Sequence, residues 1–112
     1  MAIGDRIPTE LVAPTALSAT ATAVYTNPGA SYRTEATMLS FANTGATTRT
    51  ITLYKNGTAT TNTWLCGIEV PAGKSVEIPI TKVFTGTQTL AAKQDTGTDV
   101  YITMDGVVEQ IA

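Results

Sequence analysis

The stretch from residue 64 to residue 84, WLCGIEVPAGKSVEIPITKVF, carries the strongest structural signal in the chain. Apolar residues recur at every second position before Pro71-Ala72-Gly73, and the same period returns after it. A period of two on both sides of a Pro/Gly turn is typical of two half-buried strands joined by a tight connection. We therefore predict a hairpin with one apolar face. Its predicted facing pairs are Ile68 with Val76, Cys66 with Ile78, and Trp64 with Ile80.

Alternation interrupted by turn signals continues along the rest of the chain. Further strands are expected within residues 16–26, 31–42, 47–55, 88–93 and 100–104. The segments between them, such as Asn27-Pro28-Gly29 and Asn56-Gly57, have the composition of tight turns. A turn signal at about every eight to twelve residues favours a sandwich or a jelly roll. The predicted fold class is all-β, an antiparallel β-sandwich or jelly-roll-like fold of about six to eight short strands.

The N-terminal segment differs from this pattern. Residues 1–15, MAIGDRIPTELVAPT, contain Pro8 and Pro14 and only isolated apolar residues. Proline removes a backbone donor and favours extended chain, so we predict an extended N-terminal arm over residues 1–15. Residues 16–112 are then one β-sandwich domain, as expected for a chain of 112 residues. The arm either wraps its own domain or lies on a neighbouring subunit, and we favour the neighbour.

The composition points to a surface with few charges. Charged residues make up 14% of the chain, and about one residue in five is threonine, whereas about 25% charged residues is usual. Threonine favours strands and forms hydrogen bonds without a charge. Such a surface is easier to bury against a partner, because no ion has to be desolvated. An ordinary β protein with polar outer faces remains the alternative interpretation.

Charge and targeting signals narrow the choice of partners. The formal net charge is -2 and the basic residues are scattered singly, which argues against nucleic acid as a partner. No apolar stretch is long enough to span a bilayer and no export signal is evident, so we expect no membrane association. A single cysteine gives no internal disulfide framework and fits assembly in a reducing cytoplasm.

The sequence offers little for catalysis. It contains no histidine, which is the usual base of serine and cysteine nucleophiles and a common zinc ligand. Cys66 is expected to be a buried apolar residue rather than a reactive thiol. We assign no catalytic, cofactor-binding or metal-binding residue. A small hydrolase that uses paired carboxylates is a remote alternative, and its candidate acids are Glu69, Glu77, Asp95, Asp99 and Asp105.

Several segments together resemble small β-sandwich structural proteins of tailed bacteriophages, of the capsid-decoration, head-fibre or tail-accessory type. The likeness extends over nearly the full chain. It is carried by Gly4-Asp5-Arg6-Ile7-Pro8, Val24-Tyr25-Thr26, Leu39 to Asn43 followed by Thr44-Gly45, Val70-Pro71-Ala72-Gly73, and Tyr101-Ile102-Thr103-Met104 followed by Asp105-Gly106-Val107.

The resemblance implies a non-enzymatic virion protein, most simply a capsid decoration (cement) protein that binds the outer shell and bridges capsomers. Its expected partners are the major capsid protein or other virion proteins, with a homo-oligomer, preferably a trimer. Its expected location is the virion, and the host cytoplasm before assembly. The expected interface residues lie in the arm and in the apolar C-terminal tail: Ile3, Ile7, Leu11, Val12, Val107, Val108 and Ile111.

A tail, collar, baseplate or fibre component with a receptor- or sugar-binding role is the alternative. Exposed aromatic residues grouped on one surface would favour it, and the candidates are Tyr32, Tyr54 and Tyr101.

Overall fold

Eight β-strands and one short 3₁₀ helix make up the computed structural model, which describes residues 2–112. The all-β class is therefore confirmed. Four of the strands have 11 or 12 residues, longer than the short strands predicted. The elements are β1 (Arg6–Ala16), β2 (Thr22–Thr26), β3 (Tyr32–Asn43), β4 (Arg49–Lys55), η1 (Thr60–Asn62), β5 (Thr63–Val70), β6 (Ser75–Thr85), β7 (Thr89–Gln94) and β8 (Val100–Gln110).

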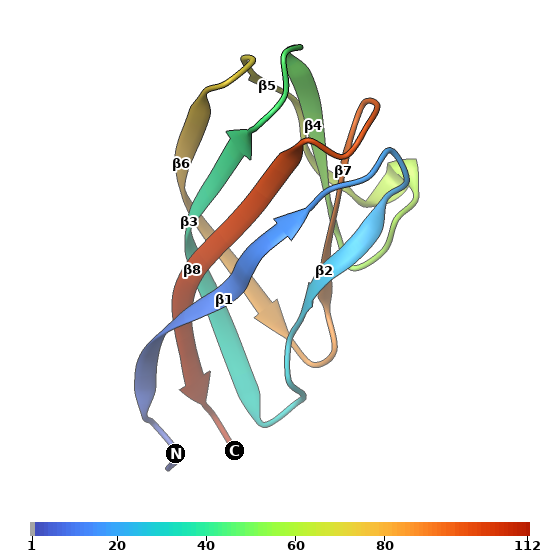
Figure 1. The fold of residues 1–112 in the computed structure, drawn as a ribbon. Helices are drawn as coiled ribbons and strands as arrows, with labels where there is room; N and C mark the ends of the chain where they lie inside the picture. Colours follow the sequence, from blue (N-terminus) through green and yellow to red (C-terminus); the bar gives the residue numbers. More distant parts are fainter. Residues whose placement is uncertain (1) are drawn as a thin grey trace.

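The strands form two antiparallel four-stranded sheets (Figure 1). Sheet A has the order β1-β8-β3-β6, and sheet B has the order β2-β7-β4-β5. In both sheets a strand from the first half of the chain pairs with its counterpart from the second half: β1 with β8, β2 with β7, β3 with β6, and β4 with β5. This nested pairing is the connectivity of a jelly roll. Within residues 2–112 no helix has the length and apolar character needed to span a membrane.

The hairpin predicted from residues 64–84 is wrong in its pairing. β5 belongs to sheet B, where Ile68 lies opposite Ile51, and β6 belongs to sheet A, where Ile78 lies opposite Leu39. The turn at residues 71–74 crosses from one sheet to the other, with a hydrogen bond from the Lys74 amide to the Pro71 carbonyl. The inward parity of β6 was predicted correctly, since Val76, Ile78 and Ile80 pack against the core.

A β-bulge changes the expected alternation in β5 before Gly67, whereas Ile68 and Val70 face the core as predicted. The pairing advances by two residues on β4, from Ile51 to Leu53, but by three on β5, from Ile68 to Leu65. Gly67 lies at this point with φ 73°, a left-handed conformation that glycine adopts at little cost. Leu65 therefore takes the inward position expected for Cys66, and the prediction that Cys66 is buried is wrong because its side chain is exposed.

The structure does not show a separate N-terminal arm. Residues 6–16 form β1, which pairs with β8 from Arg6 opposite Glu109 to Ala16 opposite Tyr101. Pro8 and Pro14 are compatible with a strand here, because β1 is an edge strand and only one of its sides has to supply hydrogen bonds. Val12 is 4% exposed and belongs to the core, so it cannot serve as an interface residue in this fold.

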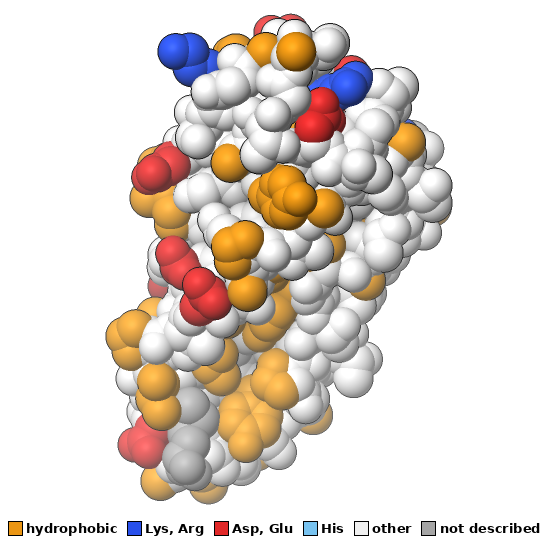
Figure 2. Space-filling view, in the orientation of Figure 1, with side chains coloured by type: hydrophobic (Ala, Val, Ile, Leu, Met, Phe, Trp, Pro, Cys, Tyr) orange, Lys and Arg blue, Asp and Glu red, His pale blue; other side chains and the backbone are white. Residues whose placement is uncertain are grey.

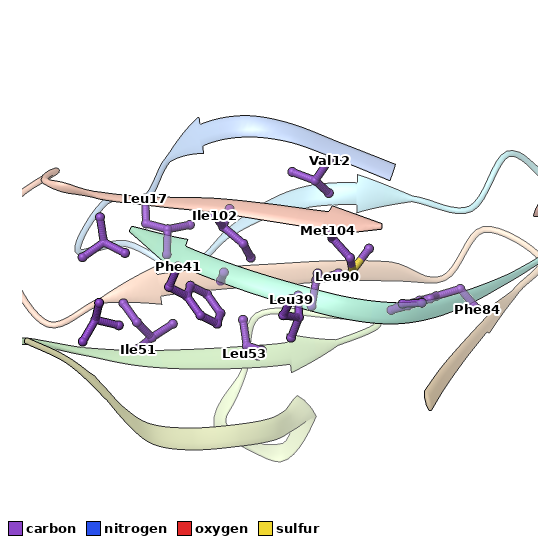
Figure 3. Packing of buried hydrophobic residues seen from close by; sticks show 14 residues of the cluster. Val12, Leu17, Leu39, Phe41, Ile51, Leu53, Phe84, Leu90, Ile102 and Met104 are labelled. Atoms are coloured by element: carbon purple, nitrogen blue, oxygen red, sulfur yellow. The ribbon is translucent and has the colours of Figure 1, made fainter. Parts of the chain in front are cut away.

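The core lies between the two sheets and is filled by aliphatic and aromatic side chains (Figure 3). Leu39 and Phe41 from β3 lie in its centre, together with Ile102 and Met104 from the neighbouring β8. Burying a side chain of this size contributes about 1.5–3 kcal/mol. The fully buried residues of sheet B that face them include Ile51, Leu53 and Leu90.

Candidate interaction surfaces

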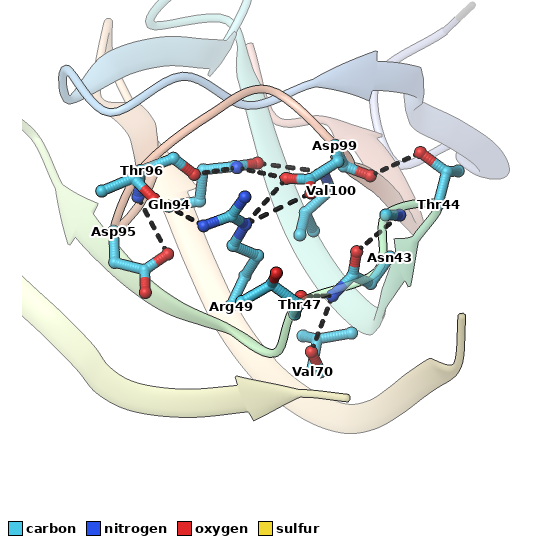
Figure 4. Close-up of polar contacts among 11 residues, drawn as sticks. Asn43, Thr44, Thr47, Arg49, Val70, Gln94, Asp95, Thr96, Asp99 and Val100 are labelled. Carbon is cyan, nitrogen blue, oxygen red and sulfur yellow. Dashed lines mark hydrogen bonds and ion pairs between the residues drawn. The ribbon is translucent and has the colours of Figure 1, made fainter. Parts of the chain in front are cut away.

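One end of the sandwich is held by a polar network, and we call it the loop end (residues 17–21, 44–48, 71–74 and 95–99; Figure 4). Gln94, the last residue of β7, is fully buried there. Its Oε1 accepts a hydrogen bond from the Val100 amide at 2.9 Å, and its Nε2 donates to Asp99 Oδ1 at 2.7 Å and to the Thr96 carbonyl. One buried amide thus fixes the whole β7–β8 turn.

Arg49 connects this turn to the start of β4. Its Nε donates to Asp99 Oδ1 at 3.0 Å and to Oδ2 at 3.2 Å, and its Nη1 donates to Thr96 Oγ1. Hydrogen bonds from Arg49 and then from Gln94 lower the pKa of the Asp99 carboxyl below its usual value of 3.8. The same contact raises the pKa of Arg49. Asp99, one of the candidate catalytic acids, therefore forms a structural ion pair with Arg49.

Asn43 completes the loop end by joining the two sheets. Its side chain is buried, and Nδ2 donates to the Thr47 carbonyl at 2.8 Å and to the Val70 carbonyl at 2.9 Å. Its Oδ1 accepts a hydrogen bond from the Gly45 amide at 2.9 Å. The β3–β4 loop and the last residue of β5 are thereby held by one side chain at the end of β3.

A second buried asparagine lies at the opposite end, which we call the terminal end because both chain termini lie there (Figure 1). Asn27 is 1% exposed. Its Nδ2 donates to the carbonyl oxygens of Gly29, Tyr32 and Gly86, and its Oδ1 accepts from Thr34 Oγ1 at 2.8 Å. The β2–β3 and β6–β7 connections are therefore tied to each other.

Two lysines lie over aromatic rings near the neighbouring edges of the two sheets. Lys82 Nζ on β6 is 5.0 Å from the centre of the Trp64 ring on β5, and Lys55 Nζ is 5.5 Å from the Phe84 ring. Trp64 is half-buried and packs against the core. Burial, with a smaller contribution from Lys82, lowers the pKa of Lys55. These contacts cover the side of the core between β5 and β6.

Apolar side chains are exposed at the terminal end. Ile3 is 71% exposed, Ile7 46% and Ile111 41%. Pairing of β1 with the end of β8 brings the two predicted segments together, since Ile7 lies opposite Val108 and Pro8 opposite Val107. Figure 2 shows hydrophobic side chains gathered over the lower part of this face, around the termini. We call the group of Ile3, Ile7, Val108 and Ile111 the terminal surface. Val107 lies on the other face of sheet A, beside Pro8 and Glu35.

Two further expected interface residues lie in the core or against it. Val12 is in the core, and Leu11 is half-buried and packs against it. β1 contains register shifts between residues 10 and 15, so simple alternation does not describe which side chains point inward.

The structure does not bring the acids Glu69 and Glu77 together into a hydrolase site. Glu69 lies on β5 and Glu77 on β6, so the two acids belong to different sheets rather than to one hairpin face. Among residues 2–112, no group of three or more acidic, cysteine or histidine side chains is arranged to hold a metal ion. Three surface depressions have volumes of about 190, 250 and 190 Å³, below the roughly 300–1,000 Å³ of typical ligand pockets.

The three candidate tyrosines do not share a surface. Tyr54 is 6% exposed and belongs to the core. Tyr32 starts β3 at the terminal end, whereas Tyr101 lies opposite Ala42 towards the loop end. The aromatic group that would favour a sugar-binding role is therefore not formed.

Four residues that hold the turns, Asn27, Asn43, Gln94 and Arg49, were not predicted from the sequence. Each lies at or next to the end of a strand. Asparagine at such a position is a usual turn residue, because its side chain forms hydrogen bonds with nearby backbone groups. That signal was available for Asn27 and Asn43. Nothing local marks Gln94 or Arg49, since their contacts depend on how the β7–β8 turn folds back.

Comparison with known proteins identifies the fold and not a family. No protein-family model matches the chain, and no curated sequence is a significant relative. A chain of the Bacillus endospore appendages, which form a family of disulfide-linked pili, matches with a TM-score of 0.56 and 12% identity over 99% of this chain and 93% of that chain. At this identity the likeness concerns the fold alone.

Two viral structures match less closely. A pentameric capsid protein isolated from metagenomic phage sequences matches with a TM-score of 0.43 and 22% identity, over 88% of this chain and 61% of that chain. A chain of infectious bursal disease virus matches with a TM-score of 0.42 and 9% identity, over 93% of this chain and 31% of that chain. The chain thus spans less than two thirds of these viral proteins. Its class is that of jelly-roll β-sandwich domains, an architecture used by viral capsid proteins, lectins and cupins.

Proposed function

We propose that the protein is a non-enzymatic structural component of a bacteriophage virion, which acts by binding other protein subunits. The observation that carries this proposal is the terminal surface. It exposes Ile3, Ile7 and Ile111 from two chain segments at one end of the domain, and apolar patches on protein surfaces are common contact sites. The threonine-rich, weakly charged outer faces support the same proposal, because their burial costs little.

Within the virion, the most specific role we propose is capsid decoration. A decoration (cement) protein binds the major capsid protein on the outer shell, bridges capsomers and stabilises the shell by mass action. The protein would reside in the host cytoplasm before assembly and in the virion afterwards. Homo-oligomer formation belongs to this proposal, since identical patches on many copies can close into a ring or a cluster.

Particle binding tests the proposal directly. Purified particles that lack the protein are incubated with the wild-type chain, and electron microscopy scores its occupancy on the shell while heating scores shell resistance. The double variant Ile7→Asp/Ile111→Asp places two charges on the terminal surface and is expected to lose binding. Thr48→Asp/Thr98→Asp is the matched control, because it adds the same charge at two exposed positions of the loop end.

Two results would contradict the proposal. Equal binding by the Ile7→Asp/Ile111→Asp variant and the wild type would exclude the terminal surface as the contact. Detection of the protein only below the portal of native particles would exclude the decoration role and favour a tail or collar component.

A further inference from the structure

A row of charged residues crosses the outer face of sheet A near the terminal end. Arg6, Glu109 and Arg33 lie side by side on β1, β8 and β3. Arg33 donates to Glu109 Oε1 from Nε at 3.1 Å and from Nη2, and Arg6 Nη1 lies 3.8 Å from the same oxygen. One carboxylate therefore faces two guanidinium groups, and this row has an excess of positive charge.

The next row along the strands has an excess of negative charge. It consists of Pro8, Val107, Glu35 and Val83 on β1, β8, β3 and β6. Within residues 2–112, the Glu35 side chain forms no ion pair, although it is half-buried. Val83 beside it is 38% exposed. The two rows line one shallow depression of about 190 Å³, whose lining residues are Arg6, Arg33, Glu35, Val83, Val107 and Glu109.

We propose that this outer face of sheet A binds a second copy of the chain about a two-fold axis. The axis lies in the plane between the two copies, perpendicular to β3, and passes over the midpoint between Arg33 and Glu35. These two residues lie on the same face of the sheet, two residues or about 6.6–6.8 Å apart. A two-fold rotation there places Arg33 of each copy opposite the partner's Glu35, so that one patch is complementary to itself. The inference deepens the proposed function, on which it rests, by naming a partner and the face that binds it.

The contact is small, because the axis lies near the end of the sheet: β3 begins at Tyr32, so only about five residues of each strand overlap in the two copies. Four strands spaced about 4.8 Å apart then give roughly 300 Å² of each partner, which is the size of a weak contact rather than that of a standard interface. Sheets that pack face to face in this way are aligned within about 30°. A two-fold dimer fits this face better than the trimer expected from the sequence, because a three-fold contact would need a second, different patch.

Sedimentation velocity of the wild-type chain over about 1–500 µM is the first measurement, since self-association depends on concentration. We expect the mass to rise from the 11.7 kDa monomer to twice that value. Raising the salt from about 0.05 to about 0.5 M is expected to weaken the dimer, because exposed charges are screened. A chain that stays monomeric throughout this range, or that forms trimers, overturns the inference.

Charge reversal at Glu35 is the second measurement. Glu35→Lys places like charges opposite each other twice in the dimer and is expected to weaken self-association at least about tenfold. Val83→Arg is expected to weaken it through a buried charge, without involving any ion pair of the monomer. Glu69→Lys makes the same charge change on β5 in sheet B and is expected to leave the dimer unchanged. If Glu35→Lys and Val83→Arg both dimerise as the wild type does, this face is not the contact.

The particle assay separates this inference from the proposed function. A wild-type chain that binds particles but remains monomeric in solution overturns the inference and leaves the proposed function standing. A chain that forms the Glu35-dependent dimer but never binds particles supports the inference and contradicts the virion role.

Discussion

The two ends of the sandwich use buried amides alike but differ in what they leave exposed. At the loop end, Gln94 and Asn43 hold the turns, and Arg49 and Asp99 neutralise each other outside them. At the terminal end, Asn27 holds the turns in the same way, but Ile3, Ile7 and Ile111 remain in solvent beyond it.

Buried amides stabilise both ends, and the difference shows which end is available to a partner. Polar groups at the loop end are already paired, so a partner would have to break internal hydrogen bonds to use them. Exposed isoleucines at the terminal end gain free energy when water is removed from them. Both ends therefore support folding, while binding is favoured at the terminal end.

Truncation of the N-terminus gives the largest expected effect. It tests which of the first 12 residues the domain needs in order to fold. Deleting residues 1–12 removes Val12 and half of β1, and should abolish cooperative folding, because the β8 backbone and the core become exposed. Deleting only residues 1–5 removes Ile3 but keeps β1, and should leave a folded domain. Circular dichroism with thermal melting distinguishes the two. A folded domain after the longer deletion would show that residues 1–12 are an arm after all.

Removal of the Gln94 amide should have the next largest effect. Gln94→Ala leaves the buried Val100 amide without its acceptor and opens a cavity, so we expect a loss of about 2–4 kcal/mol in the free energy of unfolding. Gln88→Ala is the matched control, because the Gln88 Oε1 accepts one hydrogen bond in an exposed turn at the terminal end. Urea denaturation measures both. Equal losses in the two variants would contradict a special contribution from the buried Gln94 amide.

The acid sensitivity of the Asp99 ion pair at the loop end should be the smallest effect. The pKa of Asp99 is lower in the folded chain than in the unfolded chain, so its contribution to stability is complete above the usual value of 3.8 and is lost as the pH falls through the folded pKa. We expect the stability of the wild type to fall in this acidic range, and the fall to be smaller in Asp99→Asn. Urea denaturation at about pH 7 and about pH 3 tests this. Asp105→Asn, on the outer face of β8, is the control, and an identical pH profile for Asp99→Asn and the wild type would contradict the prediction.

Several features of the fold could be read from local sequence. Alternation located most of the strands, and it placed Val76, Ile78 and Ile80 on the inner face of β6 correctly. Clustering of apolar residues near the two termini was also visible. The sequence did not show that β1 and β8 bring Ile7 and Val108 side by side, because strand pairing over about a hundred residues leaves no local signal.

The sequence by itself determined an all-β chain, because a period of two places alternate side chains on opposite faces of any strand. Only the tertiary structure decided which strands are neighbours. The turn at residues 71–74 crosses between the sheets instead of closing a hairpin, and the bulge at Gly67 turns Cys66 outward. Periodicity describes one strand at a time, whereas pairing and bulges are chosen by how eight strands together enclose one core.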